Sequence, residues 1–112
     1  MRQAKVFYKR ENAGLLVQYD SGKFMFRYHD YWFTNPQKPS ISLTLNKSSQ
    51  EHNSEYLFPF FFNMLPEGEN KEVVCSNLRI DKRDHLGILI KTAQFDTIGA
   101  IQLREISSDG TD

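Results

Sequence analysis

Hydrophobic side chains are densest in the middle of the chain, at residues 57–65. The largest of them recur at the i, i+3, i+4 and i+7 spacing of one helical face. These side chains are Phe58, Phe61, Phe62 and Leu65. We expect all four, Phe62 included, to be core residues that face a sheet. Pro59 suits the first helical turn and Pro66 ends the helix, so residues 66–68 are predicted to form a corner before a second helix.

Short β-prone runs precede this helix. Residues 4–9 and 14–19 predict two strands with a polar turn between them, and Asp-Ser-Gly at 20–22 is a hairpin signal. Residues 23–28 alternate between apolar and polar side chains, which predicts a half-buried strand. Its buried face is expected to carry Phe24, Phe26 and Tyr28. Residues 41–45 alternate in the same way and predict another short strand.

Polar segments separate these strands. The prolines of residues 35–39 indicate a loop, and residues 46–53 are polar enough to predict an exposed loop.

The pattern becomes helical after the corner. Residues 69–78 predict a short amphipathic helix, and Asp84 is a suitable N-cap for the next one. That helix repeats apolar residues at helical spacing, namely Leu86, Leu89, Ile90 and Ala93. Residues 98–103 predict a last strand that returns to the sheet.

This order of elements predicts an α+β fold. We expect an antiparallel, partly barrel-like sheet of about five short strands, with about three helices packed on one side. Residues 1–106 would form a single domain and residues 107–112 a flexible tail.

Composition adds few constraints. A chain of 112 residues suits one domain. Its 14 basic and 14 acidic residues cancel, which argues against direct nucleic-acid or membrane binding. The single cysteine, Cys75, suits a reducing compartment, and no apolar run has the length of a membrane span, so we expect a cytoplasmic protein.

Motifs for catalysis, cofactor binding or metal binding are not found. The three histidines and Cys75 lack metal-ligand spacing. No nucleophile elbow or phosphate-binding glycine loop occurs. Arg83-Asp84-His85 resembles part of a kinase catalytic loop, but Leu89 stands where a metal-binding Asn is required. We therefore predict no catalytic residue, no cofactor and no metal.

Three groups of residues are candidates for contact with a partner. Tyr31, Trp32 and Phe33 follow a predicted strand, and they either close one end of the core or expose at least one ring. Glu67 and Glu69 either complement a helix dipole or face a basic partner surface. A basic cluster formed by Arg79, Lys82 and Arg83 is a solvated loop or a weak phosphate contact.

The run Phe61-Phe62-Asn63-Met64-Leu65-Pro66-Glu67-Gly68 resembles the F-F-x-N-L-L-P-E-G signature of the N-terminal subdomain of HipA-type serine/threonine kinases. Similar pieces occur in the same order between about Val6 and Leu103, including residues 39–45 and Gly99-Ala100-Ile101. The family-signature residues are Phe61, Phe62, Leu65, Pro66, Gly68 and Gly99. One departure is Thr97, where many members carry a cysteine.

The resemblance implies a non-catalytic module, because these kinases carry their ATP and metal ligands after this subdomain. Two situations are open. The chain is either a stand-alone, HipS-like protein that binds and restrains a HipA-like kinase in a bacterial toxin–antitoxin system, or a fragment of a full-length kinase that contacts a helix-turn-helix antitoxin.

Overall fold

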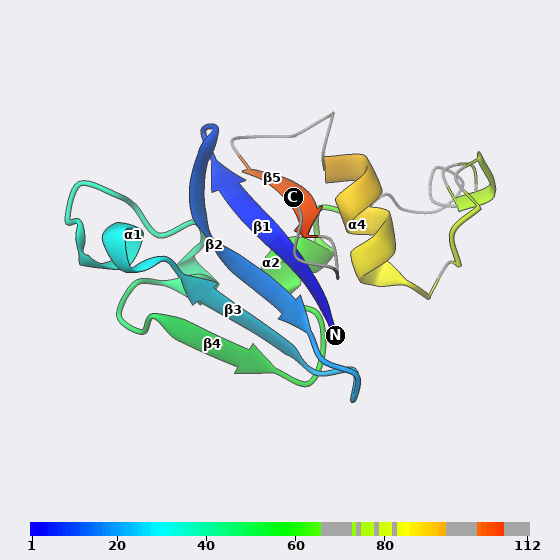
Figure 1. Cartoon of the computed structure of the whole chain (residues 1–112), viewed down its shortest axis with the longest axis horizontal. Helices are drawn as coiled ribbons and strands as arrows, with labels where there is room; N and C mark the ends of the chain where they lie inside the picture. Colours follow the sequence, from blue (N-terminus) through cyan, green and yellow to red (C-terminus); the bar gives the residue numbers. More distant parts are fainter. Residues whose placement is uncertain (66–72, 74, 78, 82, 94–100, 107–112) are drawn as a thin grey trace.

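Five antiparallel strands form one open sheet in the order β4-β3-β2-β1-β5 (Figure 1). This computed structural model describes residues 1–65, 73, 75–77, 79–81, 83–93 and 101–106. The strands are β1 (Arg2–Tyr8), β2 (Glu11–Gln18), β3 (Phe24–Tyr28), β4 (Glu51–Ser54) and β5 (Ile101–Ile106). The helices are α1 (Asp30–Thr34), α2 (Pro59–Phe62), α4 (His85–Ala93) and the 3-10 turn η1 (Leu43–Leu45). The predicted α+β class and strand number are confirmed, but the sheet is open rather than barrel-like.

One face of the sheet carries the core. The strand register places Ala4 opposite Leu16, and Leu16 opposite Phe26, all of them fully buried. Helix α2 lies behind the sheet in Figure 1 and packs Phe61 against Phe26, with ring centroids 6.0 Å apart. Helix α4 packs beside β5. The predicted alternation of β3 is confirmed, because Phe24, Phe26 and Tyr28 are its buried residues.

Gly14 in β2 allows the backbone of β3 and the Phe26 ring to approach β2 closely. A Cβ atom at Gly14 would lie 2.4 Å from the carbonyl oxygen of Arg27 and 2.9 Å from Cζ of Phe26. The first of these neighbours is backbone in the adjacent strand and cannot move aside. Position 14 therefore requires glycine for close approach.

The strand predicted at residues 41–45 is wrong. This segment curls into η1, so that Ile41 and Leu45 are buried while Leu43 is 94% exposed. The cause is Tyr28, whose hydroxyl donates to the carbonyl oxygen of Leu45 and accepts from the backbone N–H of Ile41. One hydroxyl thus draws the two ends of the segment together. The Ser42 side chain accepts from the Thr44 N–H at 3.2 Å and favours the turn.

This hydroxyl gives a first prediction. Burial raises the pKa of Tyr28, so the phenol stays neutral and keeps its proton for donation. We expect Tyr28→Phe to reduce the free energy of unfolding by about 1–3 kcal/mol, because two buried backbone groups lose their partner. Urea denaturation measures the loss. A free energy equal to that of the wild type would show that residues 41–45 hold their shape without the hydroxyl.

The loop predicted at residues 46–53 is also partly wrong, because strand β4 begins at Glu51. This strand is polar throughout and pairs with β3 at the edge of the sheet, where Phe26 faces His52. Backbone hydrogen bonds to β3 hold this edge strand of four residues in the sheet. Its sequence therefore does not need to alternate between apolar and polar side chains.

Other expectations fall wholly or partly outside the described residues. They concern the corner at 66–68, most of the helix at 69–78, the start of the last strand at 98–100 and the tail at 107–112. The remainder of that last strand is confirmed as β5.

Candidate protein-binding surface

A surface pocket of about 250 Å³ opens at the end of the sheet where β2 ends and β3 begins. It is formed by β2, the β2–β3 turn, β3, residues 55–57, α2 and the start of α4. Its lining residues are Gln18, Gly22, Phe24, Glu55, Tyr56, Leu57, Phe62, Arg83 and His85. We call this site the aromatic pocket.

Phe62 lines the pocket, and its exposure corrects the sequence-based prediction. The ring is 48% exposed, whereas Phe58, Phe61 and Leu65 are buried as predicted. The reason is the length of α2, which is a single turn from Pro59 to Phe62. A single turn presents one narrow face to the core, and Phe58 and Phe61 occupy it. Phe62 lies beside that face.

His85 supports the exposed ring. Its imidazole meets Phe62 edge to face, with centroids 5.3 Å apart and planes at 86°. His85 is the first residue of α4 and is half-buried, so it holds Phe62 against the body of the domain. Phe62 is therefore an exposed ring whose position is fixed by packing, which lowers the entropy that a partner must remove on binding.

Tyr56 is a second exposed aromatic side chain of the pocket. It is 78% exposed, and its backbone N–H donates to Oγ of Ser54 at 3.2 Å. Tyr56 is not among the residues predicted from the sequence to contact a partner. The sequence does contain a signal for it, because Tyr56 is a lone aromatic residue at the end of the polar segment that precedes the hydrophobic stretch.

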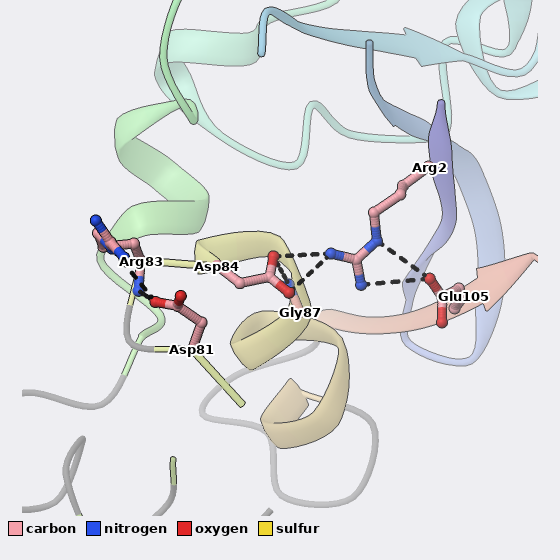
Figure 2. A network of polar contacts seen from close by, with 6 residues as sticks. All are labelled: Arg2, Asp81, Arg83, Asp84, Gly87 and Glu105. Carbon is pink, nitrogen blue, oxygen red and sulfur yellow. Dashed lines mark hydrogen bonds and ion pairs between the residues drawn. The ribbon is translucent and has the colours of Figure 1, made fainter. Parts of the chain in front are cut away.

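Arg83 supplies a cation at the rim of the pocket. Its side chain is 92% exposed and its Nε lies 3.5 Å from Oδ1 of Asp81 (Figure 2). The pKa of Asp81 is lowered, first by the Arg83 backbone N–H, which donates to its carboxylate at 2.8 Å, and then by the Arg83 side chain. Of the predicted basic cluster, Arg83 thus lies beside the pocket, whereas Lys82 is outside the described residues.

Asp84 fixes the start of α4 beside the pocket. Its Oδ1 accepts from the Gly87 N–H at 3.1 Å, so the predicted N-cap is confirmed. Arg2 of β1 donates to both carboxylate oxygens, at 2.7 and 3.0 Å, and also approaches Glu105 of β5 at 3.4 Å (Figure 2). One carboxylate therefore joins the helix to the sheet.

The two roles of Asp84 can be separated by mutation. We expect Asp84→Ala to reduce the free energy of unfolding by about 1–2 kcal/mol, because the cap and the ion pair are both lost. Asp84→Asn keeps a capping oxygen and loses only a half-exposed ion pair, which is worth about 0–1 kcal/mol. Thermal denaturation of both variants measures the difference. Equal losses would mean that the Arg2 pair, and not the cap, holds the helix.

The predicted aromatic segment lies apart from the pocket, on α1. Trp32 is buried and donates from Nε1 to the carbonyl oxygen of Pro39 at 2.8 Å. Phe33 is half-buried and packs against the core. Tyr31 is 49% exposed, and its hydroxyl donates to the carbonyl oxygen of Asn12. Only Tyr31 of the three presents much of its ring to solvent.

Several other candidate residues are not placed. Glu67, Glu69, Pro66, Gly68 and Gly99 lie outside the described residues. In the part of the chain that the structure does describe, no three His, Cys, Asp or Glu side chains gather as a metal site. The described helices also include none that is long and apolar enough to cross a membrane.

The fold is that of a small α+β domain, and its aromatic pocket brings together two exposed aromatic side chains, Tyr56 and Phe62. The family profile described as HipA N-terminal domain matches residues 4–104, and the chain therefore belongs to this family. The resemblance noted in the sequence is thus confirmed.

Two similar proteins support the assignment. An uncharacterized protein of Haemophilus influenzae is 33% identical over 107 residues, which cover 94% of this chain and 93% of the relative. A solved structure described as the N-terminal domain of HipA toxin is similar with a TM-score of 0.71 and 27% identity, over 96% of this chain and 95% of that one.

Proposed function

We propose that this protein is a non-catalytic, HipS-like module that binds a HipA-like serine/threonine kinase toxin in the cytoplasm and restrains it, as one component of a toxin–antitoxin system. The observation that carries the proposal is the family match over residues 4–104, which identifies the chain with the domain that precedes the catalytic part of these kinases. In a full-length kinase such a domain would pack against the catalytic part within one polypeptide. A separate copy of it would retain a surface for that part.

The aromatic pocket is the surface that best suits this contact. Interfaces concentrate their binding energy in a few aromatic and arginine side chains surrounded by polar groups. Tyr56, Phe62 and Arg83 gather around one hollow, and Glu55 and His85 lie at the same site. We propose Phe62 as the central anchor, with Tyr56 and Arg83 beside it.

Co-purification tests this function. The tagged protein, expressed with a HipA-like kinase of the same organism, should retain that kinase and reduce its autophosphorylation. No retained kinase and unchanged autophosphorylation would overturn the proposal. The same assay with a helix-turn-helix protein from the same gene neighbourhood would show whether the complex has a third component.

The alternative is that the chain is the N-terminal subdomain of a longer HipA-like kinase and contacts a helix-turn-helix antitoxin. The solved structure of such a domain of a HipA toxin favours it. The Haemophilus influenzae relative favours a stand-alone module, because 93% of that whole protein aligns with this chain. The reading frame decides: a frame that continues past Asp112 into kinase sequence supports the alternative, and a stop codon excludes it.

A further inference from the structure

The tip of the β1–β2 hairpin, formed by Lys9 and Arg10, has an unusual backbone. Tyr8 pairs with Glu11, so these two residues alone form the loop. Their φ angles are +50° and +69°. Two consecutive positive φ values are the signature of a type I′ turn, which strongly prefers Asn and Gly at these positions. Here both positions are occupied by long, basic side chains.

Lys9 and Arg10 are unfavourable residues for the stability of this turn. Left-handed backbone is strained for residues with a Cβ atom, and Asn or Gly would relieve the strain. Two adjacent cations also repel each other. Strained backbone that is retained in a fold points to a function for the residues concerned.

The charge of the tip is available to a partner. Both side chains are exposed. The carboxylate nearest in sequence, Glu11, accepts a hydrogen bond from Nζ of Lys38 at 2.6 Å. Nζ of Lys9 lies 5.6 Å from the centre of the Tyr8 ring, and none of the described carboxylates forms an ion pair with Arg10. The tip is therefore a concentrated positive charge on a chain whose net charge is zero.

We propose that Lys9 and Arg10 form a second contact surface, which recognises a cluster of carboxylates on the protein partner. This inference rests on the proposed function, because that partner is the HipA-like kinase. A nucleic-acid backbone fits less well, since a neutral chain with two clustered cations releases few counterions.

The position of the tip defines what it would do. The tip precedes the first residue of β2, and Gln18 at the other end of that strand lines the aromatic pocket. Figure 1 shows these two ends of β2 far apart. That strand has eight residues and spans about 24 Å. A charged contact so far from the aromatic anchors would lie at the rim of an interface, and rim charges act chiefly on the association rate. The tip would steer the encounter, and the pocket would retain the partner.

Three variants isolate this effect. Lys9→Asn combined with Arg10→Gly removes the charge and relieves the backbone strain. Lys9→Arg combined with Arg10→Lys keeps both the charge and the strain. Lys91→Gln removes one exposed cation from α4 and tests whether a charge lost elsewhere on the surface has the same effect. Surface plasmon resonance against the purified kinase, at low and high salt, measures the rate constants, and thermal denaturation checks the fold.

We expect the Asn-Gly variant to melt at or above the wild-type temperature and to associate at least fivefold more slowly at low salt, with a dissociation rate within twofold. The difference should shrink at high salt, and the swapped and Lys91→Gln variants should behave like the wild type.

Unchanged association by the Asn-Gly variant would overturn the inference while leaving the proposed function intact. Absence of kinase binding by the wild type would instead overturn the proposed function. Tight, salt-sensitive binding of duplex DNA that the Asn-Gly variant loses would show that the tip recognises phosphates, contrary to the proposal.

Discussion

Replacing Phe61 by alanine should reduce the free energy of unfolding by about 3–5 kcal/mol, because transfer and cavity terms add at a buried aromatic residue. Phe61 is fully buried and meets three other rings, those of Phe26, Phe58 and Phe60, at centroid distances of 6.0, 6.3 and 5.2 Å. Most small domains have about 5–15 kcal/mol in total. We therefore expect the variant to be marginally folded at 37 °C.

The adjacent phenylalanine is the matched control for this experiment. Phe62→Ala removes the same side chain from the next position, but that ring is 48% exposed and lies outside the core. We expect it to cost about 1 kcal/mol, since only part of the ring's area is withdrawn from water. Urea denaturation of both variants compares them directly. Similar losses at the two positions would contradict the assignment of Phe61 to the core and Phe62 to the surface.

These two residues also show how far the sequence could predict the structure. Periodicity identified the hydrophobic stretch and placed Phe58, Phe61 and Leu65 correctly in the core. It placed Phe62 there as well, because the full i, i+3, i+4 and i+7 pattern assumes a regular helix of two turns from Phe58 to Leu65, whereas α2 is a single turn. The pattern contains no information that α2 ends at Phe62.

A strand could be predicted from the sequence where one of its faces is buried and the other is exposed. The alternation in β3 is such a case, and it is confirmed. The alternation at residues 41–45 was equally regular, yet a single tertiary contact from the Tyr28 hydroxyl folds that segment into a turn. The pattern of side chains within a segment cannot reveal a hydrogen bond that a residue of another strand donates to it. The edge strand β4 could not be predicted, because its side chains are polar and only backbone pairing with β3 makes it a strand.

The candidate surface was harder to predict than the fold. The pocket joins the end of β2, residues 55–57, α2 and the start of α4, which are far apart in the sequence. The resemblance to HipA-type kinases predicted the family and a binding role, but it did not select a surface. Tyr56 and His85 become candidates only when the fold brings them to Phe62.

Phe62→Ala should weaken binding to the HipA-like kinase by about 2–4 kcal/mol, which is the usual cost of truncating a central aromatic anchor. The ring is exposed in the free domain, and a partner would withdraw its remaining surface from water. His85 already fixes its position, so little side-chain entropy remains to be lost on binding. The expected change is a rise of about 30-fold or more in the dissociation constant.

Isothermal titration against the purified kinase measures this change, and a melting curve of the same variant separates binding from folding. Tyr31→Ala is a suitable control, because it removes an exposed aromatic side chain of α1, outside the pocket. If Tyr31→Ala weakened the complex and Phe62→Ala did not, the interface would lie over α1 and the aromatic pocket would have no role in it. A loss confined to Phe62→Ala, with the fold retained, would identify the pocket as the surface that holds the kinase. It would also give a physical reason for a phenylalanine at this position of the family signature, where the fold alone leaves half of the ring in water.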